Sequence, residues 1–96
     1  MKTNLLLKLL TQTNDANKMS LLLKALFTSK ELKELDNRLK IFQMLLKGKR
    51  QREISESLGV GIATVTRGSQ VFENEKLFKI KSKIIDILKN DEIYDL

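Results

Sequence analysis

Residues 61–67 place small, polar and cationic side chains at the spacing of one helix face. If Val65 points toward a protein core, the neighbours left toward solvent are Ala63, Thr64, Thr66 and Arg67. A threonine hydroxyl can donate to or accept from a base edge, and alanine or a threonine methyl can contact thymine. Gln51 and Arg52 would begin a preceding helix, where backbone N–H groups and a cation suit a phosphate. These residue types indicate contact with duplex DNA.

Two short helices joined by a tight turn, spanning residues 51–70, would position these side chains. The segment reads QREISESLGVGIATVTRGSQ, in which Ser55 is the small residue at the crossing and Gly59 permits the turn. The expected apolar contacts with the core are Ile54, Leu58, Ile62 and Val65. The pattern predicts a helix-turn-helix, although a purely structural helical hairpin could share it.

The composition excludes several kinds of site. The 96 residues include no Cys and no His, which removes disulfides, typical zinc ligands and Ser-His or Cys-His nucleophiles. We therefore expect no catalytic residue, no metal site and no enzymatic activity, and interpret Glu53, Glu56 and Glu73 as ordinary surface carboxylates. The net charge of +6 favours a polyanionic partner.

Three further helices are expected ahead of the helix-turn-helix. Residues 1–10 could form a short one, and Asn14 or Asp15 is a plausible N-cap for the next. Apolar residues cover nearly the whole circumference of residues 18–27, so this helix must be buried on several sides, which favours a homodimer. Thr28 and Glu31 form a capping box that begins the third.

This third helix is expected to end at Gly48 and to bury Leu32, Leu35, Leu39, Phe42 and Leu45 or Leu46. Its exposed face would carry Lys33, Asp36, Lys40 and Gln43.

The last helix, within residues 75–90, has an apolar face of Leu77, Ile80, Ile84 and Ile87 or Leu88. Its other face carries Lys76, Lys79, Lys83 and, nearby, Lys81. A helix that closes the core is favoured over a membrane-surface or acidic-partner helix.

These elements predict one all-α domain of about six helices over residues 1–96. Residues 1–47 would form a helical dimerisation core, residues 51–70 a DNA-reading head and residues 75–90 a C-terminal helix. No segment holds enough uncharged apolar residues to span a membrane, so the expected location is cytoplasmic, with no membrane partner.

One stretch of the chain resembles the tryptophan repressor family. The string GIATVTRGS at residues 61–69 is specific, because a general helix-turn-helix has no reason to end in Thr-Arg-Gly-Ser, and the similarity covers about residues 26–70. The resemblance implies an intertwined homodimer in which two heads address successive major grooves of an operator, as expected of a transcriptional repressor.

The resemblance also implies site residues. It gives DNA contacts to Gln51, Arg52, Ile62, Ala63, Thr64 and Thr66, to which the exposed face adds Arg67. It implies a ligand site for L-tryptophan, an amino-acid corepressor, at Thr28, Arg38, Arg67 and Gly68. Two guanidinium planes can sandwich an indole, and Arg67 and Thr28 can bind a carboxylate. Filling the site would shift the reading helix toward its DNA-binding position.

Other interpretations of these residues stay open. Arg38 could simply pair with Glu34 on the helix surface, and Arg67 could be a plain phosphate contact. The segment between Gly48 and Gln51 is one residue shorter than in the well-known members, and Val71 stands where they have a serine. The alternative is therefore a DNA-binding regulator of this fold with a different ligand or none. The hypothesis from a different functional class is a helix bundle for protein or membrane interaction.

Overall fold

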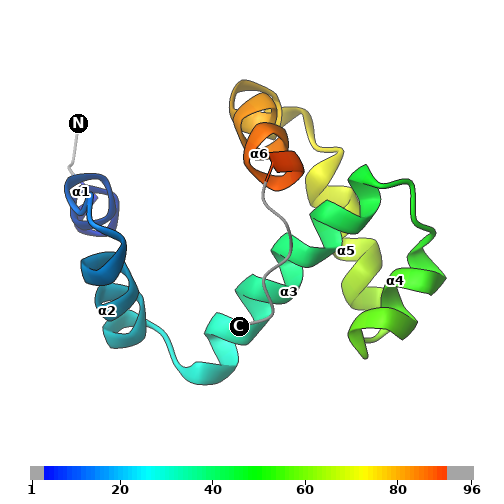
Figure 1. Ribbon diagram of the computed structural model, residues 1–96, viewed down its shortest axis with the longest axis horizontal. Helices are drawn as coiled ribbons and strands as arrows, with labels where there is room; N and C mark the ends of the chain where they lie inside the picture. The colour runs from blue at the N-terminus through cyan, green and yellow to red at the C-terminus, as the bar shows by residue number, and fades with distance from the viewer. Residues whose placement is uncertain (1–3, 91–96) are drawn as a thin grey trace. The chain divides into compact units, whose positions relative to one another are not determined.

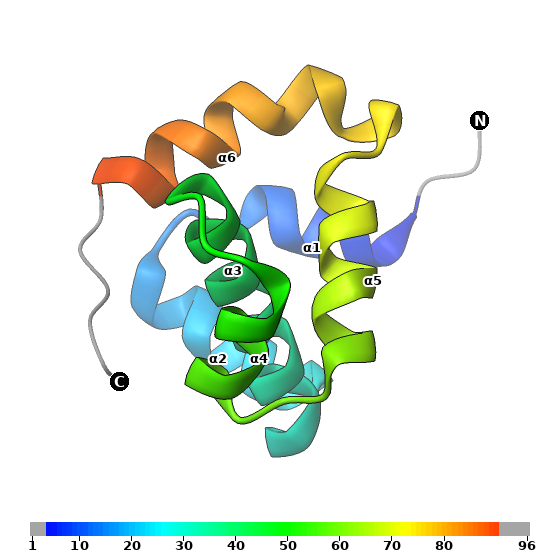
Figure 2. The ribbon, with the colours of Figure 1, turned by 90° about the vertical axis from the view of Figure 1, so that its right-hand side faces the viewer.

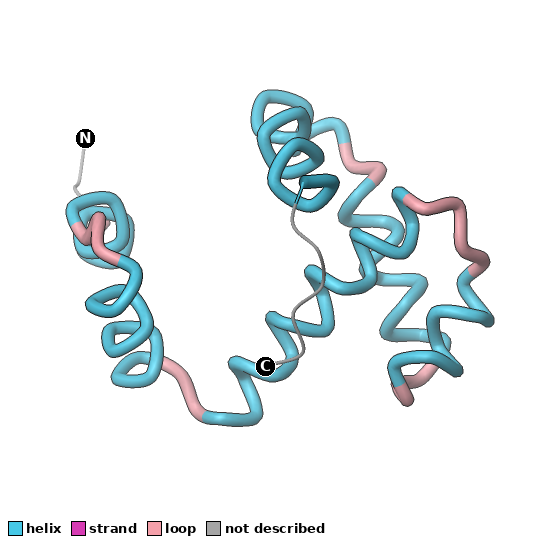
Figure 3. The backbone as a smooth tube through the Cα atoms, viewed as in Figure 1, coloured by secondary structure: helices cyan, strands magenta, loops and turns pink. Residues whose placement is uncertain are grey.

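The computed structural model describes residues 4–90, which form six α-helices, one short 3-10 turn and no strand (Figures 1 and 3). The elements are α1 (Leu5–Gln12), α2 (Ala16–Leu26), α3 (Ser29–Leu46), α4 (Gln51–Leu58), α5 (Ile62–Phe72), η1 (Glu75–Leu77) and α6 (Phe78–Asn90). The expected all-α class and helix number are confirmed. Residues 1–3 of the first expected helix lie outside the described residues.

The chain falls into two compact units, one ending at Glu34 and the other beginning at Leu35. In the N-terminal unit, the Asn4 side chain caps α1 by accepting from the N–H of Leu7 at 3.2 Å. Asp15, one of the two expected caps, accepts from the N–H of Lys18 at 2.9 Å and begins α2. Neither helix buries a single residue.

The expected capping box begins α3. The Glu31 N–H donates to the Thr28 hydroxyl at 3.1 Å, and the Thr28 N–H donates to the Glu31 carboxylate at 2.9 Å. These two hydrogen bonds hold the pKa of Glu31 below its ordinary value of 4.5. The start of α3 is therefore set by local side-chain chemistry, as the sequence predicts.

The C-terminal unit has a small core to which three helices contribute. Ile41 of α3, Ile54 of α4 and Val65 of α5 have no exposed surface, and Met44, Leu45, Leu58 and Val60 pack around them. The rings of Phe42 and Phe72 lie 5.1 Å apart and extend the contact between α3 and α5. Figure 2 shows α4 and α5 beside the C-terminal half of α3, with α6 running past the end of α3.

Two expectations about α3 are wrong. Gln43 was expected on the exposed face but is buried, because its side-chain amide donates to the main-chain carbonyl of Leu88 at 3.1 Å and ties α6 to α3. Leu35 and Leu39 were expected in the core but are about half exposed, whereas the buried residues of α3 come later, at Ile41, Phe42 and Gln43.

The face that α6 turns inward also differs from expectation. Of the two alternatives Ile87 and Leu88, Leu88 is the partly buried one, but Ile80 is half exposed. Lys81 is instead half buried, with its ammonium 4.7 Å from the centre of the Phe72 ring. A lysine stem can cover apolar surface while its charge rests on an aromatic face, so this lysine takes a position expected for an aliphatic residue.

Candidate nucleic-acid interface

The turn between α4 and α5 is built around Gly59 and Ser55. Gly59 has φ +67°, the left-handed conformation that glycine adopts without steric cost, and its N–H donates to the Ser55 carbonyl. The Ser55 hydroxyl donates to the Val60 carbonyl at 2.6 Å. The sequence predicted Ser55 only for its small size and missed this bond. A serine one turn before a helix-ending glycine was the available signal.

Three of the four expected apolar contacts hold α4 and α5 against α3. Ile54 and Val65 are fully buried and Leu58 is partly buried. Ile62 is half exposed, so its expected role in the core is wrong. It is the first residue of α5, directly after the N-cap Gly61. Ile62 therefore belongs to the outer surface of α5.

The exposed surface of α5 carries most of the residues expected there. Those that lie open to solvent are Ile62, Ala63, Thr64 and Arg67. This set combines an aliphatic group, a methyl, a hydroxyl and a guanidinium on the first two turns of one helix. Such a surface can approach base edges closely and contact phosphate at its cationic end.

Thr66 differs from the other expected surface residues because it is partly buried. Its hydroxyl lies 2.7 Å from the Gln51 amide oxygen and 3.0 Å from the Ile62 carbonyl oxygen. A hydroxyl has one proton, so it can donate to only one of them at a time. When it donates to Gln51, the amide NH₂ of Gln51 stays available to an outside acceptor. Thr66 thus positions Gln51 and links α4 to α5.

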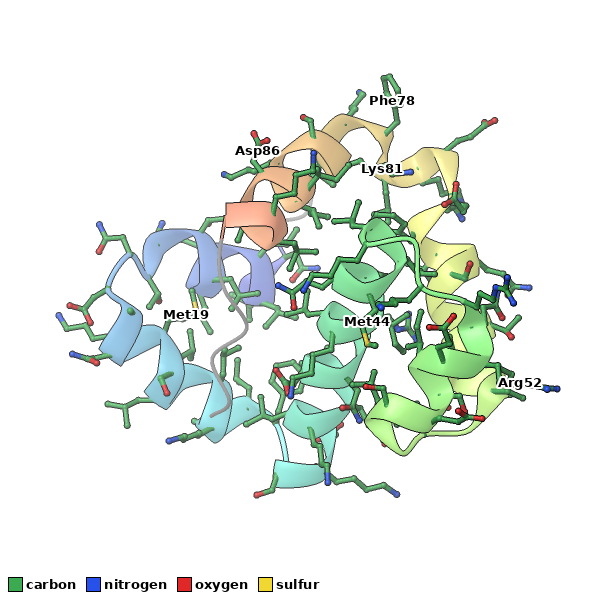
Figure 4. The ribbon with its side chains drawn as sticks, turned by 45° about the vertical axis from the view of Figure 1, so that its right-hand side comes forward. Met19, Met44, Arg52, Phe78, Lys81 and Asp86 are labelled. Atoms are coloured by element: carbon green, nitrogen blue, oxygen red, sulfur yellow. The ribbon has the colours of Figure 1, made fainter. Side chains whose placement is uncertain are left out.

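The start of α4 lies directly beside this link. Arg50 is the N-cap and makes no side-chain capping bond, so the first N–H groups of α4 keep capacity for an external acceptor. Arg52 is exposed and extends away from α4 (Figure 4). A helix start with free donors and an adjacent guanidinium is suited to an anionic oxygen.

The structure brings two of the four expected ligand residues together. Gly68 is buried against α3, and a Cβ placed on it would lie 2.9 Å from Cγ2 of Ile41 and 3.6 Å from Cδ of Arg38. The absence of a side chain at Gly68 therefore allows α5 to approach α3 beside the Arg38 stem. Arg67, the residue before Gly68, lies on the exposed side of α5.

Thr28 belongs to the N-terminal unit, where its hydroxyl accepts the Glu31 N–H. That hydroxyl still has a proton to donate, which a ligand carboxylate could accept.

Within residues 4–90 the ion pairs are Lys40 with Asp36 at 3.0 Å and Lys81 with Glu73 at 4.0 Å. The pair that could have explained Arg38, with Glu34, is not among them.

Residues 4–90 contain no cluster of acidic side chains that could hold a metal ion. None of their helices is long and apolar enough to cross a membrane.

Comparison with known proteins identifies the family. The family model described as Trp repressor protein matches residues 1–80. A Trp operon repressor homolog of Vibrio parahaemolyticus is 36% identical over 91 residues, covering 88% of each chain. A homolog of the same name from Xylella fastidiosa is 32% identical over 74 residues, covering 76% of this chain and 80% of its own.

A further Trp operon repressor homolog, from Vibrio vulnificus, is 54% identical over 50 residues, covering 51% of this chain and 49% of its own. No solved structure matches significantly. The similarities support a transcriptional repressor of the Trp repressor type and not an enzyme. The chain belongs to the Trp repressor protein family.

Proposed function

We propose that the chain represses transcription by binding an operator in duplex DNA through the outer surface of α5 and the start of α4. The observation that carries this proposal is the surface of Ile62, Ala63, Thr64 and Arg67, held on α4 by the bond between Thr66 and Gln51. The α5 side chains would read base edges in a major groove, while Gln51 and Arg52 would contact phosphate. A repressor acts on the chromosome, so this function implies a cytoplasmic location.

We further propose that the protein acts as a homodimer. The N-terminal unit exposes large aliphatic side chains and its helices bury none, which a monomer of this size cannot sustain in water. The exposed leucines on α1 and α2 are Leu5, Leu6, Leu7, Leu9, Leu21 and Leu26. A second copy related by twofold symmetry would cover them and present two reading heads to one operator. Sedimentation equilibrium tests this, and a monomer at micromolar concentration would contradict it.

L-tryptophan is the corepressor that we propose for the site around Arg38 and Gly68. The support is the Arg38 stem beside Gly68 and the exposed Arg67 on the same helix as Gly68. A guanidinium plane can stack on an indole, and a second cationic donor suits an amino-acid carboxylate. The second candidate is a regulator of the same fold that uses another ligand or none, favoured by the short connection between Gly48 and Gln51 and by the apolar Val71.

Calorimetry and DNA binding with and without L-tryptophan distinguish these candidates. If L-tryptophan is the corepressor, its binding to the protein should release or absorb heat, and the protein should bind the operator more tightly when L-tryptophan is present. Arg38→Ala should abolish the heat, whereas Lys33→Ala, an exposed cation on the same helix, should leave it unchanged. Tight operator binding with no heat and no ligand effect would refute the corepressor and leave the second candidate. Absence of any duplex binding would refute both.

A further inference from the structure

The connection between α3 and α4 carries an unusual density of positive charge. Residues 47–52 read KGKRQR, and their four cations Lys47, Lys49, Arg50 and Arg52 are all exposed. None of the four belongs to the ion pairs found within residues 4–90. Their charges are therefore not neutralised by carboxylates in the described part of the chain. We call residues 47–50 the basic turn.

Hydrogen bonds set the backbone of the basic turn. Gly48 has φ +76°, its N–H donates to the Leu45 carbonyl at 3.0 Å, and the Lys49 N–H donates to the Met44 carbonyl at 3.0 Å. This pair of bonds is a Schellman motif at the end of α3. The turn then enters α4 directly, since the Arg50 carbonyl accepts the Ile54 N–H at 3.0 Å. Binding a partner would therefore cost side-chain entropy but little backbone ordering.

The basic turn adjoins the proposed reading surface. Arg50 is the N-cap of α4, and the next residue, Gln51, contacts Thr66 on α5 through its amide oxygen at 2.7 Å. Lys49 lies two residues before Gln51, a backbone reach of at most about 7 Å. Figure 2 shows the connection between α3 and α4 leading directly into the start of α4. A phosphate strand that contacts Gln51 would pass within reach of the cations on the basic turn.

We infer that the basic turn binds the DNA phosphate backbone that flanks the base pairs read by α5. This inference rests on the proposed DNA binding and extends the contact surface beyond the helix-turn-helix. Lysine ammonium groups and an arginine fork suit phosphate oxygens, and their effect is independent of sequence. A membrane surface is a poorer partner, because residues 47–50 include no apolar side chain that could insert into lipid.

The chain provides a charge-matched control for the test. The variant Lys47→Gln/Lys49→Gln/Arg50→Gln removes three positive charges from the turn. The control Lys76→Gln/Lys79→Gln/Lys83→Gln removes three from exposed positions on η1 and α6. Both variants have the same net charge, so general attraction between protein and DNA is equal in the two. Circular dichroism and denaturant unfolding of both establish that each remains folded.

Binding would be measured by fluorescence anisotropy over a range of salt concentrations, with and without L-tryptophan. The probes are a mixed-sequence duplex and a duplex recovered from a random pool by the wild-type protein. If all three side chains neutralise phosphates, the basic-turn variant should lower the steepness of log K against log salt by about 2.7. Affinity for both duplexes should fall by similar factors, while the control keeps the wild-type slope.

Three results separate the inference from the proposed function. Equal slopes for the basic-turn variant and the control would overturn the inference while leaving DNA binding intact. Loss of affinity for the selected duplex alone would also overturn it, because phosphate contacts carry no direct sequence information. A wild-type protein that binds neither duplex would instead overturn the proposed function.

Discussion

Gly68→Ala should lower the free energy of unfolding, although alanine is the better helix former. The new Cβ would lie 2.9 Å from Cγ2 of Ile41, closer than carbon atoms can pack. Ile41 is fully buried and β-branched, so Cγ2 cannot move away without a change of rotamer or a shift of α5 from α3. Overpacking of this kind costs about 1–3 kcal/mol.

The gain in helix propensity opposes this cost. Replacing glycine by alanine inside a helix stabilises by roughly 0.5–1 kcal/mol. The packing cost exceeds this gain at its midpoint, so we expect a net loss of about 1 kcal/mol. For a chain of this size that corresponds to a fall in Tm of about 4–8 °C.

Denaturant unfolding at fixed protein concentration measures the effect. Ser57→Ala, at an exposed position on α4, is the control in which only helix propensity changes. The variant Ile41→Ala removes Cγ2, so Gly68→Ala should become neutral or stabilising in that background. If Gly68→Ala in the wild-type background gained as much stability as propensity alone allows, the close approach of α5 to α3 would be refuted.

Three other residues yield predictions. Thr66→Val should lower the free energy of unfolding by about 0.5–1.5 kcal/mol and weaken duplex binding, because it removes the hydrogen bond to Gln51. Thr66→Ser keeps that bond and should have neither effect. Urea unfolding measures the stability of each variant, and fluorescence anisotropy measures its duplex binding. Gly59→Ala should lower the free energy of unfolding by about 1–2 kcal/mol, as measured by urea unfolding. The whole effect comes from the positive φ, since the space around a Cβ there is open. An unchanged free energy of unfolding would contradict the left-handed turn. The lowered pKa of Glu31 stabilises the fold above the ordinary value of 4.5, and this stabilisation is lost as pH falls through the lowered pKa. Urea unfolding across that acid range should therefore show a steeper loss for the wild type than for Glu31→Gln, and parallel curves would contradict the capping box.

Features that depend on a few consecutive residues were predictable from the sequence. The capping box of Thr28 and Glu31, the Asp15 cap and the left-handed turn at Gly59 are all present as expected. Each arises because a side chain or a glycine satisfies backbone groups within three or four positions, with no help from distant parts of the chain. Apolar spacing likewise identified Ile54 and Val65 as core residues.

Features that depend on how helices face one another were not predictable. The sequence placed Gln43 and Thr66 toward solvent and Ile62 in the core, yet Gln43 bonds to α6, Thr66 bonds to α4 and Ile62 is exposed. Helical periodicity shows which residues share a face but not which neighbour covers that face. Lys81, which occupies an inward position against Phe72, shows that residue type alone does not decide burial.

The sequence by itself determined the all-α class, the helix-turn-helix and the family, because turn chemistry, apolar spacing and the string at residues 61–69 are local properties of the chain. Only the tertiary structure decided which side chains those helices expose. Gly68 illustrates the difference, since the sequence marks it as a glycine within a helix and only the approach of Ile41 shows why a side chain does not fit there. That approach depends on the crossing of α5 over α3, which is a property of the packed core.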